Sequence, residues 1–360
     1  MQTGLATEPG DGFAFHGNWR EFLPIAATNL LFTIVTLGFY RFWATARERR
    51  YLWSRTEFLD DRLEWAGTGK EMFIGFLIAI ALFLPLVLFL QFGVQALILR
   101  GMPGWAALAS LAVYAGILFL VGVARFRALR YRLSRTYWRG IRGGSNESGW
   151  VFGRSYLWRT WVSLILIGLL VPWAMVTLWR KRWREMSFGS AEFSVGDSAP
   201  TQGIFARYLL IPLAFVVGGI VLFGSVFALG AASGGRPPSP SMMLAILPGL
   251  LAFYCIVGFA SLAYFSAFYR KVIAEMTLGG LSFAFTARAK DWFLLILGHI
   301  GLVIVTLGLG YVFIGYRNWS FFIRHMQAHG SFDADALAQS TTPLRSDAEG
   351  LADAFDIGAI

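Results

Sequence analysis

The chain is short of charged residues and has almost no cysteine. Asp, Glu, Lys and Arg make up 14% of its 360 residues, whereas they form about 25% of an average soluble domain. The single cysteine, Cys255, excludes an internal disulfide. Hydrophobic residues account for 56% of the chain and the mean hydropathy is +0.58. We therefore expect an integral membrane protein rather than a soluble, disordered or disulfide-stabilised one.

Charge is absent altogether from seven hydrophobic runs, none of which contains Asp, Glu, Lys or Arg. A transmembrane helix needs about 20 mainly apolar residues, and its backbone must form hydrogen bonds within its own segment. Gly and Pro at 101–104 and 233–241 predict tight turns that join two pairs of runs into helical hairpins. The predicted fold class is an α-helical polytopic integral membrane protein with hydrophobic runs 22–40, 72–99, 101–124, 160–179, 208–235, 237–269 and 292–316.

Positive charge is unevenly distributed between the loops. The chain has 31 Lys and Arg against 21 Asp and Glu. The loop at 41–71 carries seven basic residues and the loop at 125–159 carries nine, whereas the two short turns carry only Arg100 and Arg236. Basic loops are retained on the cytoplasmic side of a membrane. The sequence therefore predicts a multi-pass protein whose basic loops are cytoplasmic.

Strict alternation of seven spans conflicts with this bias, because it places the basic cluster at 180–184 on the outer side. The conflict disappears if runs 22–40, 160–179 and 292–316 enter and leave the membrane on the same side. Each of these runs contains Gly or Pro, at 36–38, 171–173 and 306–310, and a re-entrant segment can turn at such residues. Re-entrant segments beside two spanning hairpins are preferred, and seven kinked spans remain the alternative.

Short alternating stretches around a two-residue turn recur in the basic loops, at 56–67, 186–196 and 276–285, with a looser version at 136–152. This pattern is typical of β-hairpins, and we expect them to form a small cytoplasmic β-layer. The order of runs and hairpins also predicts a parallel internal repeat. Its parts are a disordered N-terminus (1–12), a first repeat (13–159), a second repeat (160–291), a partial third repeat (292–330) and an acidic disordered tail (331–360).

The segment at 36–43, followed by Arg49-Arg50-Tyr51 and Gly67-Thr68-Gly69, resembles the YjgN-like family of bacterial inner-membrane proteins. The resemblance implies a bacterial inner-membrane location, and it implies no activity. In the second copy of the motif, Pro172-Trp173 replaces the Leu-Gly pair, so that copy departs from the pattern. The motif residues are Thr36, Leu37, Gly38, Tyr40, Arg41, Trp43, Arg49, Arg50 and Tyr51.

Polar side chains inside the runs are candidates for a membrane site. His299 is the only histidine within a run, and ionisable groups in membranes are often functional. Together with Asn29 it defines a candidate polar site, although hydrogen bonding between helices would also explain both residues. His325 and His329 have the i, i+4 spacing of two metal ligands but no third ligand near them, so no metal site is predicted.

Arginine clusters beside tryptophan and tyrosine flank the runs. Arginine grips phosphate oxygens in pairs, and basic pockets between helices bind anionic head groups. We therefore predict that membrane lipids are partners, although retention of topology alone would also explain the clusters. A pI near 10 does not predict nucleic-acid binding here, because the arginines adjoin apolar runs. The candidate head-group residues are Arg47, Arg49, Arg50, Arg180 and Arg182.

Two functions remain open from the sequence. One is a transporter or channel for an unknown small solute, with a polar cavity near Asn29 and His299. The alternative is a lipid-interacting or envelope-scaffold protein that binds anionic head groups. No combination of nucleophile, base and metal ligands converges in the sequence, so neither an enzyme nor a cofactor is predicted.

Overall fold

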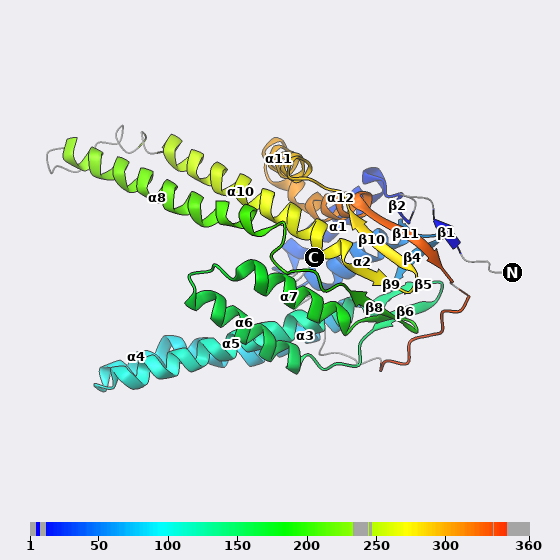
Figure 1. Ribbon diagram of the computed structural model, residues 1–360, viewed down its shortest axis with the longest axis horizontal. Coiled ribbons are helices and arrows are strands. Elements are labelled where there is room, and N and C mark those ends of the chain that lie inside the picture. The colour runs from blue at the N-terminus through cyan, green and yellow to red at the C-terminus, as the bar shows by residue number, and fades with distance from the viewer. Residues whose placement is uncertain (1–4, 8–11, 233–243, 245–246, 334, 344–360) are drawn as a thin grey trace.

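β-Hairpins and helical hairpins alternate along the chain in the computed structural model, which describes residues 5–7, 12–232, 244, 247–333 and 335–343 (Figure 1). All strand pairs are antiparallel and belong to one 11-stranded sheet. The strands are β1 (Leu5–Thr7), β2 (Phe13–Phe15), β3 (Thr56–Phe58), β4 (Asp61–Trp65), β5 (Thr136–Trp138), β6 (Ile141–Gly144), β7 (Ser187–Phe188), β8 (Ala191–Val195), β9 (Met276–Leu278), β10 (Leu281–Phe285) and β11 (Met326–Phe332).

The sheet curves into a nearly closed barrel. Strands β2 to β10 pair in chain order, β11 pairs with β10, and β1 pairs with the other side of β11. Strand β2 at the opposite edge also contacts β11. The first two strands are close in sequence, but they form the two opposite edges of the sheet. We call the gap between these edges the seam.

Apolar side chains fill the interior of this barrel. Along β10 the side chains of Leu281, Phe283 and Phe285 are buried while Ser282 is exposed, which is the alternation of a sheet with one face in the core. Rings from distant strands meet there, since the centroids of Trp138 on β5 and Phe332 on β11 are 6.1 Å apart. The same buried cluster continues into the bases of four helices.

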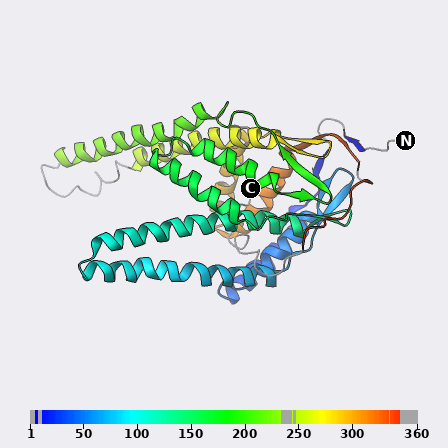
Figure 2. The same ribbon diagram turned by 60° about the horizontal axis from the view of Figure 1, so that its bottom comes forward.

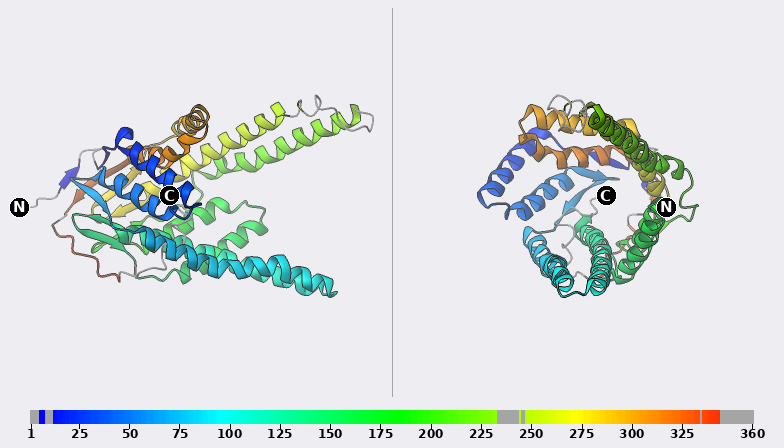
Figure 3. Two further views of the ribbon diagram at one scale, coloured as in Figure 1. Left: turned by 180° about the vertical axis from the view of Figure 1, so that it is seen from behind. Right: turned by 90° about the vertical axis from the view of Figure 1, so that its left-hand side faces the viewer.

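The helices form hairpins between successive β-hairpins and stand in a ring over one end of the sheet (Figure 3). They are α1 (Trp19–Val35), α2 (Arg41–Ser54), α3 (Gly69–Leu88), α4 (Val94–Leu99), α5 (Pro103–Arg135), α6 (Trp150–Ile165), α7 (Val171–Arg184), α8 (Phe205–Ala232), α10 (Leu247–Ala274), α11 (Ala289–Val305) and α12 (Ile314–His325). A π-helical segment, η1 (Phe89–Gly93), joins α3 to α4, and a 3-10 turn, η2 (Leu309–Phe313), precedes α12.

Two of these hairpins are long and apolar. They extend together from the sheet, well beyond the shorter pair α6–α7 (Figure 2). Four helical segments of the described chain are long and apolar enough to cross a membrane, namely Gly69–Leu99, Pro103–Arg135, Phe205–Ala231 and Leu247–Ala274. Their side chains are largely exposed in the isolated chain, as Phe223 and Phe227 illustrate at 79% and 80%. Lipid is the environment that such surfaces require.

The other three helical hairpins are short, and all three have the same type of turn. In each turn a glycine N–H donates to the carbonyl oxygen five residues earlier, at 2.7–2.8 Å, which is the bond that closes a Schellman motif. The aliphatic residue before the glycine is at least 90% exposed at the tip. The paired residues, all with positive φ, are Leu37 and Gly38, Ile167 and Gly168, and Leu307 and Gly308.

The predicted fold class is wrong in two respects. Four described helical segments, rather than seven runs, are candidate spans, and the strands form an 11-stranded, nearly closed sheet rather than a small layer. Runs 22–40, 160–179 and 292–316 each combine the end of one helix, a left-handed turn and the start of the next. The alternative of seven kinked spans is therefore wrong, because an uncharged run reflects composition and not helix continuity.

Several local predictions can also be compared with the structure. The four β-hairpins lie at the predicted residues. In run 160–179 the bend is at Ile167 and Gly168 and not at 171–173, because Pro172 lies in the first turn of α7, where proline is tolerated. The parallel internal repeat stays a prediction.

Both predicted disordered ends fall partly outside the described residues, and the predicted turn at 233–241 falls entirely outside them. Within the segment expected to be a tail, Gln339 and Thr342 contact Arg142 of β6.

Candidate functional site

Arginine side chains cluster where the helices meet the sheet, and many lie over aromatic rings. The guanidinium carbons of Arg127 and Arg182 are 5.1 Å and 5.3 Å from the ring centroids of Trp150 and Trp179. Such stacking holds the cation in place and covers part of its apolar surface. The helix ends that adjoin the sheet therefore form a basic, aromatic layer next to the two long apolar hairpins.

One open pocket in this layer, of about 630 Å³, is lined by three arginines from three elements. Arg207 comes from the start of α8, Arg270 from the end of α10, and Arg288 from the segment before α11. Arg270 Nη1 donates to the carbonyl oxygen of Ala287 at 3.1 Å, and its other N–H groups have no hydrogen-bond acceptor in the part of the chain that the structure describes. None of the lining residues that the structure describes is acidic. We call this the arginine pocket.

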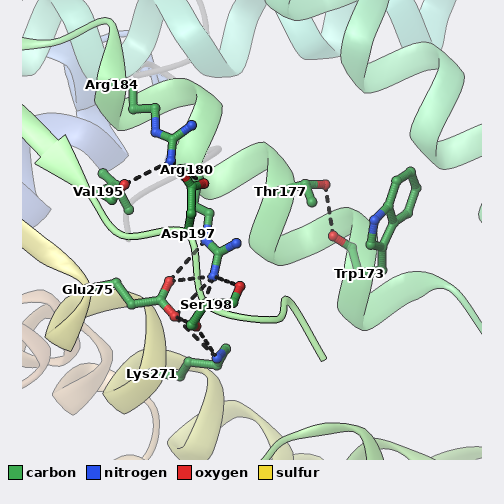
Figure 4. A network of polar contacts seen from close by, with 9 residues as sticks. All are labelled: Trp173, Thr177, Arg180, Arg184, Val195, Asp197, Ser198, Lys271 and Glu275. Carbon is green, nitrogen blue, oxygen red and sulfur yellow. Dashed lines mark hydrogen bonds and ion pairs between the residues drawn. The ribbon is translucent and has the colours of Figure 1, made fainter. Parts of the chain in front are cut away.

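A second group of charges holds α7 to α10 (Figure 4). Arg180 is buried and donates through Nε to Glu275 Oε2 at 3.0 Å and through Nη2 to the carbonyl oxygen of Ser198 at 2.7 Å. Lys271 adds an ion pair with Glu275 at 3.2 Å. Burial raises the pKa of Glu275, but hydrogen bonds from Ser198, Arg180 and Lys271 and the charge of Arg180 outweigh it, so the pKa is lowered. This network connects α7 to α10, and Arg180 directs its hydrogen-bond donors at Glu275 and Ser198.

A second cavity, of about 490 Å³, lies beside that network among α5, α6, α7 and α10. Arg125 of α5 and Arg182 of α7 line it together with a largely aromatic and aliphatic wall. We call it the inter-helix cavity.

The predicted head-group residues are divided between two short helical hairpins. On α2, Arg47 Nη1 donates to Thr28 Oγ1 at 3.1 Å, Arg49 is buried over the ring of Trp65, and Arg50 is exposed. On α7, Arg180 pairs with Glu275 while Arg182 faces the inter-helix cavity. The structure does not bring all five residues to one site. The sequence analysis did not single out the residues of the arginine pocket. They are spread over about 80 positions and come from two helix ends and one loop.

The predicted polar membrane residues also occupy separate hairpins. Asn29 is buried, and its Nδ2 donates to the carbonyl oxygen of Ala44 and to Glu48 Oε1, both at 3.3 Å. His299 on α11 lies near Arg317 of α12, and its Nε2 has no hydrogen-bond partner within the described chain. Neither residue lines the two cavities described above.

The motif at 36–51 builds the tip and base of the first short hairpin. Thr36 Oγ1 donates to the Phe32 carbonyl oxygen at 2.7 Å and accepts the N–H of Tyr40 at 2.9 Å, which spans the turn formed by Leu37 and Gly38. At the base, the Tyr51 hydroxyl donates to the carbonyl oxygen of Asn18 at 2.9 Å. Arg41 lies over the ring of Phe42, and the rings of Tyr40 and Trp43 stack with centroids 6.4 Å apart. These contacts give the motif a structural role.

Comparison with known proteins identifies relatives along nearly the whole chain. A family model described as a bacterial protein of unknown function, DUF898, matches residues 11–354. The inner membrane protein YjgN of Salmonella typhimurium is 22% identical over 378 residues, covering 92% of each chain. YjgN proteins of Escherichia coli O157:H7 and K12 are 28% and 26% identical over 39% and 45% of this chain. No solved structure matches.

The alignments with the two Escherichia coli proteins span about a third of those relatives, 32% and 36% of their length. The names of the relatives support an inner-membrane location, and the four apolar helical segments are consistent with a membrane. Because the family model covers almost all of it, the chain belongs to the YjgN-like family of bacterial inner-membrane proteins.

Proposed function

We propose that the protein is a multi-pass inner-membrane protein that binds anionic lipid head groups on the cytoplasmic side. The two long hairpins would cross the bilayer, and the sheet would lie in the cytoplasm beneath the basic layer. The observation that carries the proposal is the arginine pocket, where Arg207, Arg270 and Arg288 converge without an acidic lining residue in the described chain. Arginine forks match the oxygens of a phosphate group.

The depth of the pocket supports this assignment. Arg270 lies 23 residues after Leu247, which at 1.5 Å per residue is about 35 Å along α10. The hydrocarbon core of a bilayer is about 30 Å thick. When the apolar part of α10 fills that core, Arg270 reaches the level of the head groups, where anionic lipids attract basic residues.

The transporter hypothesis has less support. Its expected cavity would lie near Asn29 and His299, which occupy different hairpins and line neither cavity. Among the described residues, buried rings such as Trp138 and Phe332 fill the barrel interior, which does not favour a water-filled route along its axis. A solute path would have to run between the helical hairpins.

The proposal is tested with purified protein in non-ionic detergent, titrated with phosphatidylglycerol and followed by native mass spectrometry. The variant combines Arg207→Gln with Arg288→Gln, two exposed positions. Each charge-assisted hydrogen bond contributes about 1.5–3 kcal/mol, so we expect at least about a tenfold weaker affinity.

The matched control combines Arg62→Gln with Arg100→Gln, which removes the same charge from exposed positions outside the pocket. It should bind phosphatidylglycerol like the wild type. Equal binding by both double variants, or an unchanged affinity of the pocket variant, would contradict the proposal.

A further inference from the structure

Arg182 is a buried cation without an anionic partner. Its exposed fraction is 7%, its Nε has no hydrogen-bond partner, and the described chain supplies no ion pair to it. Its guanidinium lies over the ring of Trp179, 5.3 Å from the centroid. Arg180, two residues earlier and equally buried, is in contrast surrounded by acceptors from Glu275 and Ser198. The lack of a partner is therefore particular to Arg182 and not to α7.

The charges around Arg182 have the same sign. The groups that act on it electrostatically are Arg125 and Arg132 of α5 and the Tyr269 hydroxyl, and no carboxylate of the described chain does so. Burial, followed by repulsion from Arg125 and Arg132, lowers the pKa of Arg182 to about 10. The side chain is thus still protonated at neutral pH. A cation removed from water costs several kcal/mol unless a counter-charge compensates it.

Both Arg182 and Arg125 line the inter-helix cavity, from opposite helices. Arg125 lies over the ring of Tyr156 at 5.5 Å, and its Nε also has no hydrogen-bond partner in the described chain. The volume of about 490 Å³ is within the usual range of ligand sites, about 300–1,000 Å³. Two cations therefore face one space large enough for a ligand.

The remaining wall of the cavity is mostly apolar. Met175 and Leu178 of α7 and Phe265 and Phe268 of α10 contribute to it. Arg125 lies 22 residues after Pro103, about 33 Å along α5, so the cavity is at the inner boundary of a hydrocarbon core about 30 Å thick. A ligand that matches this wall has an anionic head and a hydrocarbon chain.

We propose that the inter-helix cavity binds an anionic amphiphile whose carboxylate or phosphate oxygens accept hydrogen bonds from Arg182 and Arg125 and whose chain lies along Phe265, Phe268 and Met175. The site is separate from the arginine pocket, and it stands or fails independently of the proposed function. The ligand supplies the negative charge that the described chain does not provide here.

The experiment measures thermal unfolding and native mass spectra of the full-length protein in non-ionic detergent with four probes. Oleate supplies a carboxylate with a chain, and oleoyl lysophosphatidate supplies a phosphate with a chain. Oleyl alcohol supplies the chain alone, and inorganic phosphate supplies the anion alone. We expect one or both anionic lipids to bind and raise the unfolding temperature, while the alcohol and inorganic phosphate bind at least tenfold more weakly.

Two variants separate the head from the chain. Arg182→Met removes the cation and should weaken lipid binding about ten- to a hundredfold, while the ligand-free protein unfolds at the same or a higher temperature because a buried charge is lost. Leu178→Trp keeps both arginines but fills the cavity, and should weaken binding at least tenfold. Arg62→Gln, and the variant with Arg207→Gln and Arg288→Gln, should bind like the wild type.

Three results would overturn the proposal. One is undiminished lipid binding by Arg182→Met. Another is binding of oleyl alcohol as tight as that of oleate, which removes the role of the anion. The third is binding of inorganic phosphate as tight as that of lysophosphatidate, which removes the role of the chain. Discrimination between oleate and lysophosphatidate identifies the head group.

Discussion

Arg180 and Arg182 show how much a residue's role depends on distant parts of the chain. Both belong to the basic cluster at the end of α7, and the sequence places both at a membrane boundary. The difference between them is Glu275, which lies 95 residues after Arg180 and pairs with Arg180 but not with Arg182. Sequence reasoning therefore finds the cluster and its interfacial position. It does not show which of the two arginines forms an ion pair, because that depends on how α10 packs against α7.

Removing the Glu275 carboxylate is expected to destabilise the protein. Glu275→Gln leaves Arg180 buried with weaker acceptors, and breaking one side of a buried pair costs about 3–5 kcal/mol. We expect a clear fall in the unfolding temperature in detergent at pH 7. The control is Glu192→Gln on the exposed face of β8, which should unfold like the wild type.

The same pair predicts a pH dependence. Because the pKa of Glu275 is lower in the folded protein than its ordinary value, its contribution is present at neutral pH and is lost as the pH falls through the folded-state pKa. Wild-type stability measured from pH 7 down to pH 3 should therefore decline more steeply below about pH 4.5 than that of Glu275→Gln. Parallel curves for the two proteins would contradict the assignment.

Elements with local signals can be predicted well from this sequence. The β-hairpins at 56–67, 186–196 and 276–285 combine alternating residues with a two-residue turn, and both signals lie within a dozen positions. The turn of the second short hairpin is harder to locate. Pro172 is the stronger helix breaker by residue type, but the structure uses Ile167 and Gly168 and places the proline where a helix accepts it.

Two glycines of the third short hairpin test the shared turn. A Cβ at Gly308 or at Gly301 would meet no neighbouring atom, but only Gly308 has a positive φ, of 96°. Gly308→Ala should therefore destabilise the protein by about 1–2 kcal/mol. Gly301→Ala, inside α11, should be neutral or stabilise it by up to about 1 kcal/mol. Thermal unfolding of both variants gives the comparison, and equal effects would exclude the backbone argument.

The exposed tips of the short hairpins make a second prediction at this scale. Leu37, Ile167 and Leu307 are at least 90% exposed, which suits a tip immersed in hydrocarbon. Replacing all three by Asp places carboxylates in lipid, at a cost of about 2.5–3.5 kcal/mol each near the bilayer centre. We expect a lower yield of membrane-integrated protein after carbonate extraction, whereas replacement by Met should leave the yield unchanged.

At the scale of the molecule, closure of the sheet has no local signature in the sequence. Leu5 pairs with Phe332, more than 300 positions away, and a three-residue strand such as Phe13–Phe15 carries no information about its partner. Runs 22–40, 160–179 and 292–316 are hard to interpret for a related reason, because an uncharged run can hold either one helix or two. What composition does establish is the membrane environment and the basic layer, since both depend on residue type alone.

Cysteine labelling tests the orientation of the whole protein. In a Cys255→Ser background the chain has no other cysteine, so single sites can be introduced. Met102→Cys, at the far turn of a long hairpin, should react with an impermeant maleimide in intact spheroplasts. Glu64→Cys, exposed on β4, should react only after lysis. Labelling of the β4 site before lysis would place the sheet outside the cytoplasm.

Consecutive pairing of β2 to β10 has a consequence for how the protein is made. Each new strand emerging from the ribosome finds its neighbour already present, and the helical hairpin between them can enter the bilayer in turn. The exception is the seam, since β1 must wait for β11. Until the last strand is synthesised, β10 is an open edge able to pair with another chain. Interrupted translation before residue 326 should therefore leave an aggregation-prone, membrane-inserted intermediate.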